Sequence, residues 1–219
     1  MLNFDSHDYL EPRYPNFMGE KGLKILRITT VPAIMGLIIF ALIKMPPEAQ
    51  LFYLVMWCNY IIIATALLSM KVSAGGASSG LRRATQMLLE YALGAEVIVT
   101  LVYWAIMFVV VLDKYANDVS MIVFMFLVNN IPTAFVAANV VLSKIRFSPG
   151  NWWFTLAVGA TFMLVNFIGC KINDVVYYPF LPWDGSVKSI IMPIATAGMG
   201  VLIYVLTAVC VNKLPRERA

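Results

Sequence analysis

Four polar side chains lie inside long apolar stretches of the sequence, where an amide or a carboxylate needs a partner: Glu96, Asn59, Asn130 and Asn166. If these stretches are helices with about 1.5 Å of rise per residue, the asparagines lie roughly 16–21 Å from the N-terminal side of a membrane, and Glu96 about 12 Å. An unsatisfied amide in hydrocarbon is strongly unfavourable. We therefore expect the three amides to face one another inside a bundle, as interhelical contacts or as a buried site for a lipid or a partner.

The segment FMFLVNNIPTAF, residues 124–135, combines Asn129 and Asn130 with Pro132. Proline removes a backbone donor, so the carbonyl of Val128, four residues earlier, loses its helical partner. We expect a kink here whose freed backbone is bonded by an amide from a neighbouring helix.

Glu96 allows more than one interpretation, because an intramembrane carboxylate marks a functional site by default. The sequence places no Lys or Arg at its depth. Within the chain, Glu96 would therefore be a neutral acid bonded to a carbonyl or amide, or a carboxylate reached by water. The alternative partner is a Lys or Arg of another subunit. Proton or ion transfer would need further titratable groups nearby, and the sequence suggests none.

The scarcity of histidine limits the chemistry. His7 is the only histidine and precedes the apolar stretches. A Ser-His or Thr-His pair and a histidine-ligated metal or haem inside the bundle are therefore excluded. No carboxylates have metal-binding spacing, and Cys58, Cys170 and Cys210 show no paired spacing. We predict no metal, no cofactor and no disulfide framework, with the cysteines as small buried apolar residues.

The composition indicates that these side chains lie in lipid. Hydrophobic residues make up 61% of the 219, and charged residues 13%, against about 25% in a typical soluble domain. Six apolar stretches are about 20 residues long, enough to cross a hydrocarbon core as a helix, and none shows the alternation of a membrane barrel. We predict an all-α integral membrane protein, a bundle of six transmembrane helices at 25–45, 51–70, 88–112, 120–143, 152–170 and 189–211.

Basic residues gather on one side of the predicted spans. The 16 Lys and Arg lie on the N-terminal side apart from Lys44, Lys114, Lys171 and Lys188. Positive residues mark a cytosol-like or matrix-like face, so both termini are predicted to lie there. Anionic lipid headgroups are the expected partners of this face, and nucleic acid is not.

The chain is predicted to divide into an extramembrane N-terminal arm (1–24), a transmembrane domain (25–211) and a basic C-terminal tail (212–219). The arm is too acidic for a targeting segment. The loop KVSAGGASSGLRR (71–83) is rich in Gly and Ser and is predicted to be flexible.

The loop KINDVVYYPFLPWDGSVK (171–188) is rich in aromatic residues and prolines. Two interpretations of Tyr177, Tyr178, Phe180 and Trp183 stay open. They form an aromatic belt at the membrane–water interface, or they belong to a lid over a ligand site.

Three motifs carry a resemblance: VTLVYWAIM (99–107), LVNNIPT (127–133) and VVYYPFL (175–181). In their order and helix positions they resemble the androgen-induced-gene family of six-span membrane proteins, over roughly residues 51–211. The resemblance implies intramembrane hydrolysis of fatty-acid esters of hydroxy fatty acids, by a threonine of the second helix and a histidine of the fourth.

This chain departs from the family at both catalytic positions. The family's fourth-helix segment looks like Asn-His-Gly-Met-His-Thr, and here the matching residues are Asn129, Asn130, Ile131, Pro132 and Thr133. In the second helix, the run MWCN places Met56 at the position of the threonine. A thioether cannot attack an ester, and neither an amide nor proline accepts a proton at neutral pH. The resemblance thus implies a degenerate catalytic site at Met56, Asn129, Asn130 and Pro132.

These observations favour a non-catalytic accessory or structural subunit of a larger membrane complex, which holds a lipid in the degenerate pocket. Its expected partners are membrane lipids and other membrane-protein subunits. The alternative is an intramembrane lipid-ester hydrolase with Cys58 or Thr133 as a substitute nucleophile, and a small transporter or channel around Glu96 is a third hypothesis. An endomembrane and the mitochondrial inner membrane fit the sequence equally well.

Overall fold

The computed structural model describes residues 8–75 and 77–215, and six of their helices are long and apolar enough to cross a membrane. The predicted all-α architecture is therefore confirmed. No β-strand forms among these residues; Pro12 and Ser143 pair in a single isolated bridge. The membrane-crossing helices are α1 (Glu20–Lys44), α3 (Leu54–Ser73), α4 (Ser79–Val102) continued by α5 (Phe108–Lys114), α6 (Val119–Leu142), α7 (Trp152–Asn173) and α8 (Lys188–Asn212).

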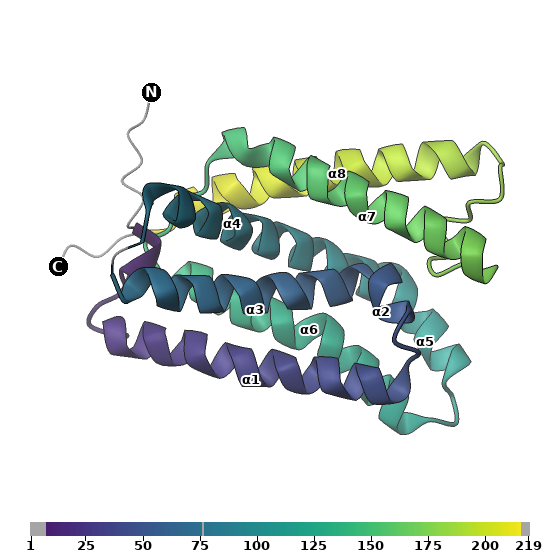
Figure 1. The fold of residues 1–219 in the computed structure, drawn as a ribbon, viewed down its shortest axis with the longest axis horizontal. Helices are drawn as coiled ribbons and strands as arrows, with labels where there is room; N and C mark the ends of the chain where they lie inside the picture. The colour runs from purple at the N-terminus through teal and green to yellow at the C-terminus, as the bar shows by residue number, and fades with distance from the viewer. Residues whose placement is uncertain (1–7, 76, 216–219) are drawn as a thin grey trace.

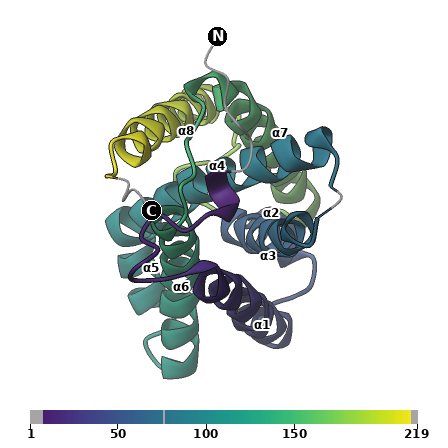
Figure 2. The same ribbon diagram turned by 90° about the vertical axis from the view of Figure 1, so that its left-hand side faces the viewer.

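The helices form two groups joined by α4. Helices α1, α3, α4 and α6 pack against one another, and the α7–α8 hairpin packs mainly on α4 (Figures 1 and 2). The start of α1 and the end of α8 lie at the same end of the bundle, on the left in Figure 1, which we call the N-terminal end. The opposite end, which we call the far end, carries α5 and the short helix α2 (Ala49–Phe52).

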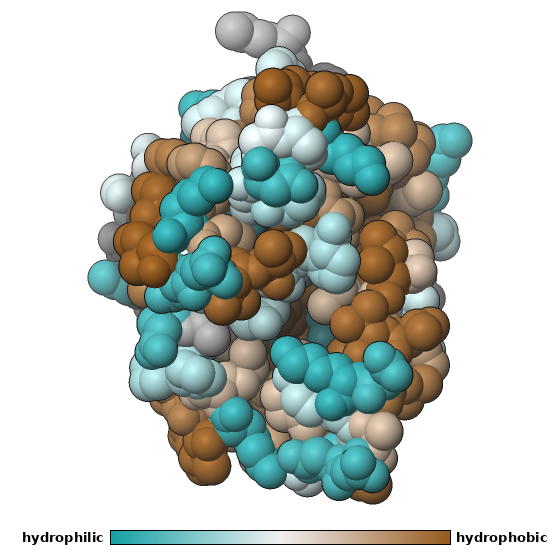
Figure 3. All heavy atoms as spheres, turned by 90° about the vertical axis from the view of Figure 1, so that its right-hand side faces the viewer, coloured by the Kyte–Doolittle hydropathy of each residue, from teal (hydrophilic) through white to brown (hydrophobic). Residues whose placement is uncertain are grey.

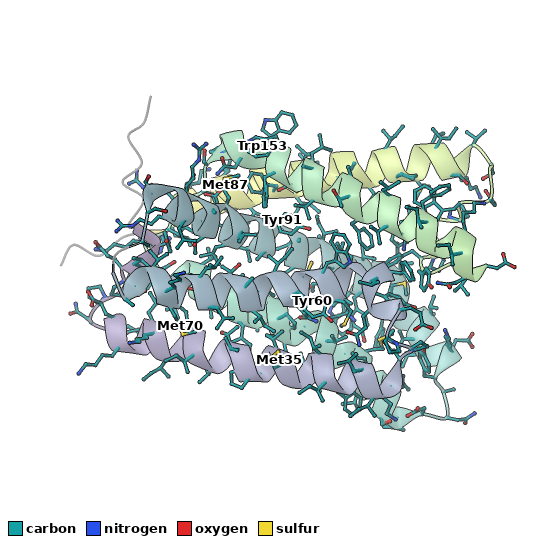
Figure 4. All side chains as sticks on the ribbon, in the orientation of Figure 1. Met35, Tyr60, Met70, Met87, Tyr91 and Trp153 are labelled. Atoms are coloured by element: carbon teal, nitrogen blue, oxygen red, sulfur yellow. The ribbon has the colours of Figure 1, made fainter. Side chains whose placement is uncertain are left out.

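Apolar side chains cover the outside of the bundle along its whole length, as a lipid environment requires. Met35 on α1 and Tyr60 on α3 are 41% and 44% exposed and lie on the outer surface (Figure 4). Inside, Tyr91 of α4 meets Phe154 of α7 ring to ring at 5.8 Å. The hairpin therefore packs against α4 through an aromatic contact inside the bundle.

Helix α4 begins at Ser79, nine residues before the predicted start at 88. The Ser78 side chain caps it by accepting a hydrogen bond from the Leu81 N–H at 3.3 Å. Hydropathy cannot detect this turn because it is polar, whereas a serine cap satisfies a free backbone donor of the first turn. The predicted flexible loop at 71–83 is consequently short, since α3 ends at Ser73.

The N-terminal arm packs against the rest of the fold, and the first membrane-crossing helix begins five residues before the predicted start at 25. Helix α1 starts at Glu20, and Arg13, ahead of it, is only 1% exposed. The Arg13 guanidinium donates to the carbonyl oxygens of Ser143 (2.9 Å), Ile145 (3.3 Å) and Leu214 (3.1 Å). One side chain therefore ties the arm to the segment after α6 and to the chain after α8.

Arg27, which the sequence suggested would lie near lipid headgroups, is also buried. Its guanidinium donates to Asn139 Oδ1 of α6 at 3.2 Å and to the Tyr9 carbonyl of the arm at 2.5 Å. Arg13 and Arg27, which were both counted toward the positive face, are thus buried and hold parts of the fold together. The part of the predicted basic tail at 216–219 lies outside the described residues, and Asn212 at its start belongs to α8.

Glu90, like Arg13, holds the N-terminal end of the bundle together through hydrogen bonds. Its fully buried carboxylate accepts hydrogen bonds from Gln86 (2.8 Å), Asn151 (2.9 Å), the Ser148 N–H (3.2 Å) and the Tyr204 hydroxyl (2.6 Å). These donors come from α4, the segment after α6 and α8. The hairpin is therefore held to α4 by a satisfied polar network.

Candidate functional site: an apolar chamber at the far end

An apolar cavity of about 80 Å³, which we call the chamber, lies between the helices in the far half of the bundle. Its walls come from α3, α6, α7, α8, the α4–α5 segment and the loop after α7. Most of the lining is aliphatic, aromatic or thioether, including Met56, Val102, Met107, Val128, Phe162 and Leu181. A neighbouring cavity of about 50 Å³, between α4 and the hairpin, shares Leu54, Ile98, Phe162, Met163 and Thr196 with it.

The loop from 174 to 187 closes one side of the chamber. Tyr177, Tyr178 and Leu181 are buried, and Tyr178 and Leu181 line the cavity. The Tyr178 hydroxyl accepts a hydrogen bond from the Leu54 N–H at 2.8 Å, and burial raises the pKa of this phenol. Of the two interpretations of this loop, the inward packing favours the lid, and we refer to it as the lid.

Asn166 holds the lid in place. Its amide donates to the Phe52 carbonyl at 3.0 Å and accepts from the Trp183 indole at 2.8 Å. Asn166 thereby joins α7 to α2 and to the lid, and it contacts neither of the other two asparagines through any hydrogen bond found in the described chain. Its role is local to the far end.

The predicted layer of facing amides is therefore wrong. Asn129 and Asn130 each donate to a carbonyl of their own helix four residues earlier, Met125 and Phe126, both at 2.7 Å. Asn130 also accepts from the Trp104 indole at 3.0 Å. An amide side chain can thus be satisfied by its own helix, which depth alone does not predict.

Asn59 is the exception among the asparagines. It is fully buried, and neither its Oδ1 nor its Nδ2 has a hydrogen-bond partner among the described residues. A buried amide without a partner is unfavourable by about 1–3 kcal/mol. We have no physical account of its retention from the contacts of this chain.

The donor for the backbone near Pro132 is a hydroxyl, where we expected an amide. Thr100 of α4 donates to the Asn129 carbonyl at 3.1 Å, one residue after the predicted position at Val128. The Thr100 hydroxyl also lies 2.7 Å from that of Thr133. Helices α4 and α6 are thus joined through two threonines beside the proline.

Glu96 finds its partner in the same cluster. Its carboxyl group is completely buried, and its Oε2 lies 2.8 Å from the Thr133 hydroxyl. The contacts Glu96–Thr133, Thr133–Thr100 and Thr100–Asn129 carbonyl need three protons, and the two threonines supply only two. A neutral Glu96 supplies the third. The geometry therefore favours the neutral acid, with one partner inside this chain at Oε2, whereas Glu96 Oε1 has no hydrogen-bond partner among the described residues.

Two of the four residues assigned to the degenerate family site lie together at the chamber. Met56 of α3 and Asn129 of α6 line it, whereas Asn130 and Pro132 are not among its lining residues. The candidate nucleophiles Cys58 and Thr133 do not line it either, nor does Glu96. Across the described chain, no group of three or more His, Cys, Asp or Glu side chains could hold a metal ion.

Tyr103 is the polar residue of the chamber that the sequence analysis missed. It lies in a π-helical turn, Tyr103–Met107, in which the Phe108 N–H reaches back five residues to the Tyr103 carbonyl. Its side chain is 1% exposed and lines the chamber, and its hydroxyl has no hydrogen-bond partner among the described residues. Such π-turns occur frequently at functional sites. The aromatic pair YW within an apolar run gave no local signal of this turn.

The comparisons with known proteins add no family: no family model, no curated protein and no solved structure matches this chain. The fold itself defines the class, a multi-pass membrane protein with six membrane-crossing helices. The chamber beneath the lid is its most developed candidate site.

Proposed function

We propose that this protein is a non-catalytic membrane subunit that holds a lipid chain in the chamber and serves as an accessory component of a larger membrane complex. The observation that carries the lipid-binding part is the mostly apolar lining of the chamber, which includes Tyr103, whose buried hydroxyl has no hydrogen-bond partner among the described residues. A buried hydroxyl without a partner is unfavourable by about 1–3 kcal/mol. A ligand with a polar group at this height would remove that penalty, and apolar pockets with a few polar groups are typical ligand sites.

The non-catalytic part rests on the chemistry of the chamber wall. Met56 occupies the place where the resemblance would require a nucleophile, and a thioether does not attack esters. The resemblance to the androgen-induced-gene family stays a prediction. A pocket that lacks acid–base groups cannot carry out this hydrolysis but can still bind a lipid. We therefore assign the protein an accessory role.

A bulky substitution that fills the chamber tests whether it binds a lipid. Val102 lines it, and Val109, on α5, is 70% exposed and points away from the core. We expect Val102→Phe to lower the lipid occupancy of the purified chain about tenfold, a loss of about 1.4 kcal/mol, with Val109→Phe as the matched control. Native mass spectrometry of both variants measures the occupancy. Equal occupancy in the two variants would refute chamber binding, and a chain that migrates alone on a native gel after mild extraction would refute the accessory role.

A second candidate function is supported by one contact. The Thr133 hydroxyl lies 2.8 Å from Glu96 Oε2, which would be the arrangement of a nucleophile beside a base in the state in which Glu96 has lost its proton. Against it, the pair lies outside the chamber lining, and Cys58 is completely buried. Turnover of long-chain esters that disappears in Thr133→Ala or Cys58→Ala would establish the hydrolase and overturn the first proposal.

A further inference from the structure

A second cavity, of about 430 Å³, opens at the far end directly beside the chamber. We call it the bowl. Met45 and Tyr53 line both cavities, so the two cavities are adjacent and only these side chains need to shift for a molecule to occupy both. Figure 3 shows this end of the protein: polar and charged side chains alternate with apolar ones around a hollowed surface.

The charges of the bowl balance. Its lining contains the cations Lys44 and Lys114 and the carboxylates Glu48 and Asp118. Lys44 is partly engaged, because its ammonium lies 3.9 Å from Asp118 and 2.8 Å from the Ser120 hydroxyl. An anionic headgroup would meet as many like charges as opposite ones, and so would a cationic headgroup. A headgroup with both charges matches the lining best.

Three tyrosines, Tyr53, Tyr115 and Tyr177, also line the bowl. The Lys114 ammonium lies 5.3 Å from the centre of the Tyr115 ring, so this ring face already receives a cation. The rings of Tyr53 and Tyr177 meet edge to face at 5.5 Å. Burial, and then the neighbouring Tyr115 and Tyr177 hydroxyls, raise the pKa of Tyr53 to about 12, so this phenol is neutral at physiological pH. Neutral aromatic rings beside carboxylates are the surroundings that bind quaternary ammonium groups.

The size of the chamber limits the apolar part of the ligand. A water-sized group needs about 10–15 Å³ of such space, so the chamber's 80 Å³ holds about five to eight methylene-sized groups. The adjoining 50 Å³ cavity adds about three to five by the same measure. One acyl chain of moderate length fits this volume, and two long chains do not.

We propose that the bowl and the chamber together bind a phospholipid with one acyl chain and a zwitterionic headgroup: the phosphate near Lys114, the ammonium near Glu48 and the tyrosine rings, and the chain in the chamber. This inference rests on the proposed lipid-holding function and specifies its ligand. The lid and the bowl share Tyr177, so the headgroup lies where the lid meets the bundle.

The experiment compares four probes with the same twelve-carbon chain: dodecylphosphocholine, dodecyl phosphate, dodecanoate and dodecyltrimethylammonium. The full chain is held in amphipol, and native mass spectrometry or calorimetry measures each affinity. We expect dodecylphosphocholine to bind at least about tenfold more tightly than any of the three probes that carry charge of only one sign, a preference of about 1.4 kcal/mol. Lys114→Gln and Glu48→Gln should each reduce the preference severalfold. Lys171→Gln, an exposed lysine at the same end but outside the bowl lining, should leave it unchanged.

The outcomes separate this inference from the proposed function. If all four probes bind equally and Val102→Phe weakens all of them, the chamber holds a chain but the bowl does not select the headgroup, and only the inference fails. If dodecanoate or dodecyl phosphate binds more tightly than dodecylphosphocholine, the inference of a zwitterionic headgroup fails and the proposed lipid-holding function stands. If no probe binds, or if Val102→Phe and Val109→Phe bind alike, the proposed function fails as well.

Discussion

The two ends of the bundle are held together by different kinds of interaction. At the N-terminal end, Arg13 and Glu90 are buried in networks that use three backbone carbonyls and four donors, respectively. At the far end, the contacts are mostly between aromatic rings of α2, α7 and the lid, and the described cavities of appreciable size lie there. The N-terminal end is fastened by buried charged groups that each make several hydrogen bonds, whereas the far end combines aromatic packing with single hydrogen bonds such as that from Asn166 to the Phe52 carbonyl.

This difference indicates which end can admit a ligand. A buried hydrogen-bond network fixes its geometry, because each lost partner leaves an unsatisfied group. Aromatic and methionine side chains can shift against one another at lower cost. We therefore expect substitutions at the N-terminal end to affect global stability, and those at the far end to affect the lid and the chamber first.

The largest effect is expected for Glu90→Ala. It removes the acceptor of four hydrogen bonds and leaves the buried Tyr204 hydroxyl with fewer partners. We expect a destabilisation of about 3 kcal/mol or more. Thermal or denaturant unfolding in detergent measures it. Glu20→Ala, at the exposed start of α1, is the control, with an expected change below about 1 kcal/mol. Similar values for the two variants would remove the contrast between the ends.

A smaller effect is expected at the far end for Gly169→Ala. A methyl group on Gly169 of α7 would overlap the ring of Phe52, which itself packs on Tyr177 of the lid at 4.9 Å between ring centres. Overpacking of this kind typically costs about 1–3 kcal/mol. The shift should also increase the exposure of Trp183, measured by its fluorescence.

Gly159, on the same helix, is the matched control because nothing lies within 4 Å of its added Cβ. Gly159→Ala should be neutral or stabilise the helix by up to about 1 kcal/mol. A lid that stays closed in Gly169→Ala would show that Phe52 does not link α7 to the lid.

The smallest effect is expected from the pH response of the lid. Hydrogen bonds from Ser186 and Ser189 to the Asp184 carboxylate lower its pKa to about 2, below the ordinary value of about 3.9. The carboxylate form is therefore favoured by the folded lid. The stabilisation that the Asp184 carboxylate gives to the folded lid is complete above about pH 4 and is lost as the pH falls toward about 2.

The measurement follows Trp183 fluorescence between pH 5 and about 2, the interval set by the two pKa values. Asp184→Asn removes the titrating group and should flatten this part of the curve. An identical curve in the variant would assign the response to another group.

Much of the fold could be predicted from the sequence, because crossing a membrane requires long apolar segments whatever their neighbours are. The six spans were predicted within a few residues, apart from the start of α4, where a polar capped turn extends the helix. The chemistry of single residues was predicted less well. Arg13 and Arg27 are basic residues of the kind expected to contact lipid headgroups. Both are buried, because oxygen atoms of residues distant in the sequence accept hydrogen bonds from them.

The sequence by itself predicted that this chain is helical and that six of its segments are long and apolar enough to cross a membrane. Only the tertiary structure decided which polar groups meet. Equal depth did not bring Asn59, Asn130 and Asn166 together, because depth fixes the height of a side chain and leaves its direction around the helix axis to packing. The same packing placed Glu96 against Thr133 and left the Tyr103 hydroxyl without a hydrogen-bond partner among the described residues. Helix length is set by local composition, whereas a site requires the relative rotation of several helices, and contacts far apart in the sequence fix that rotation.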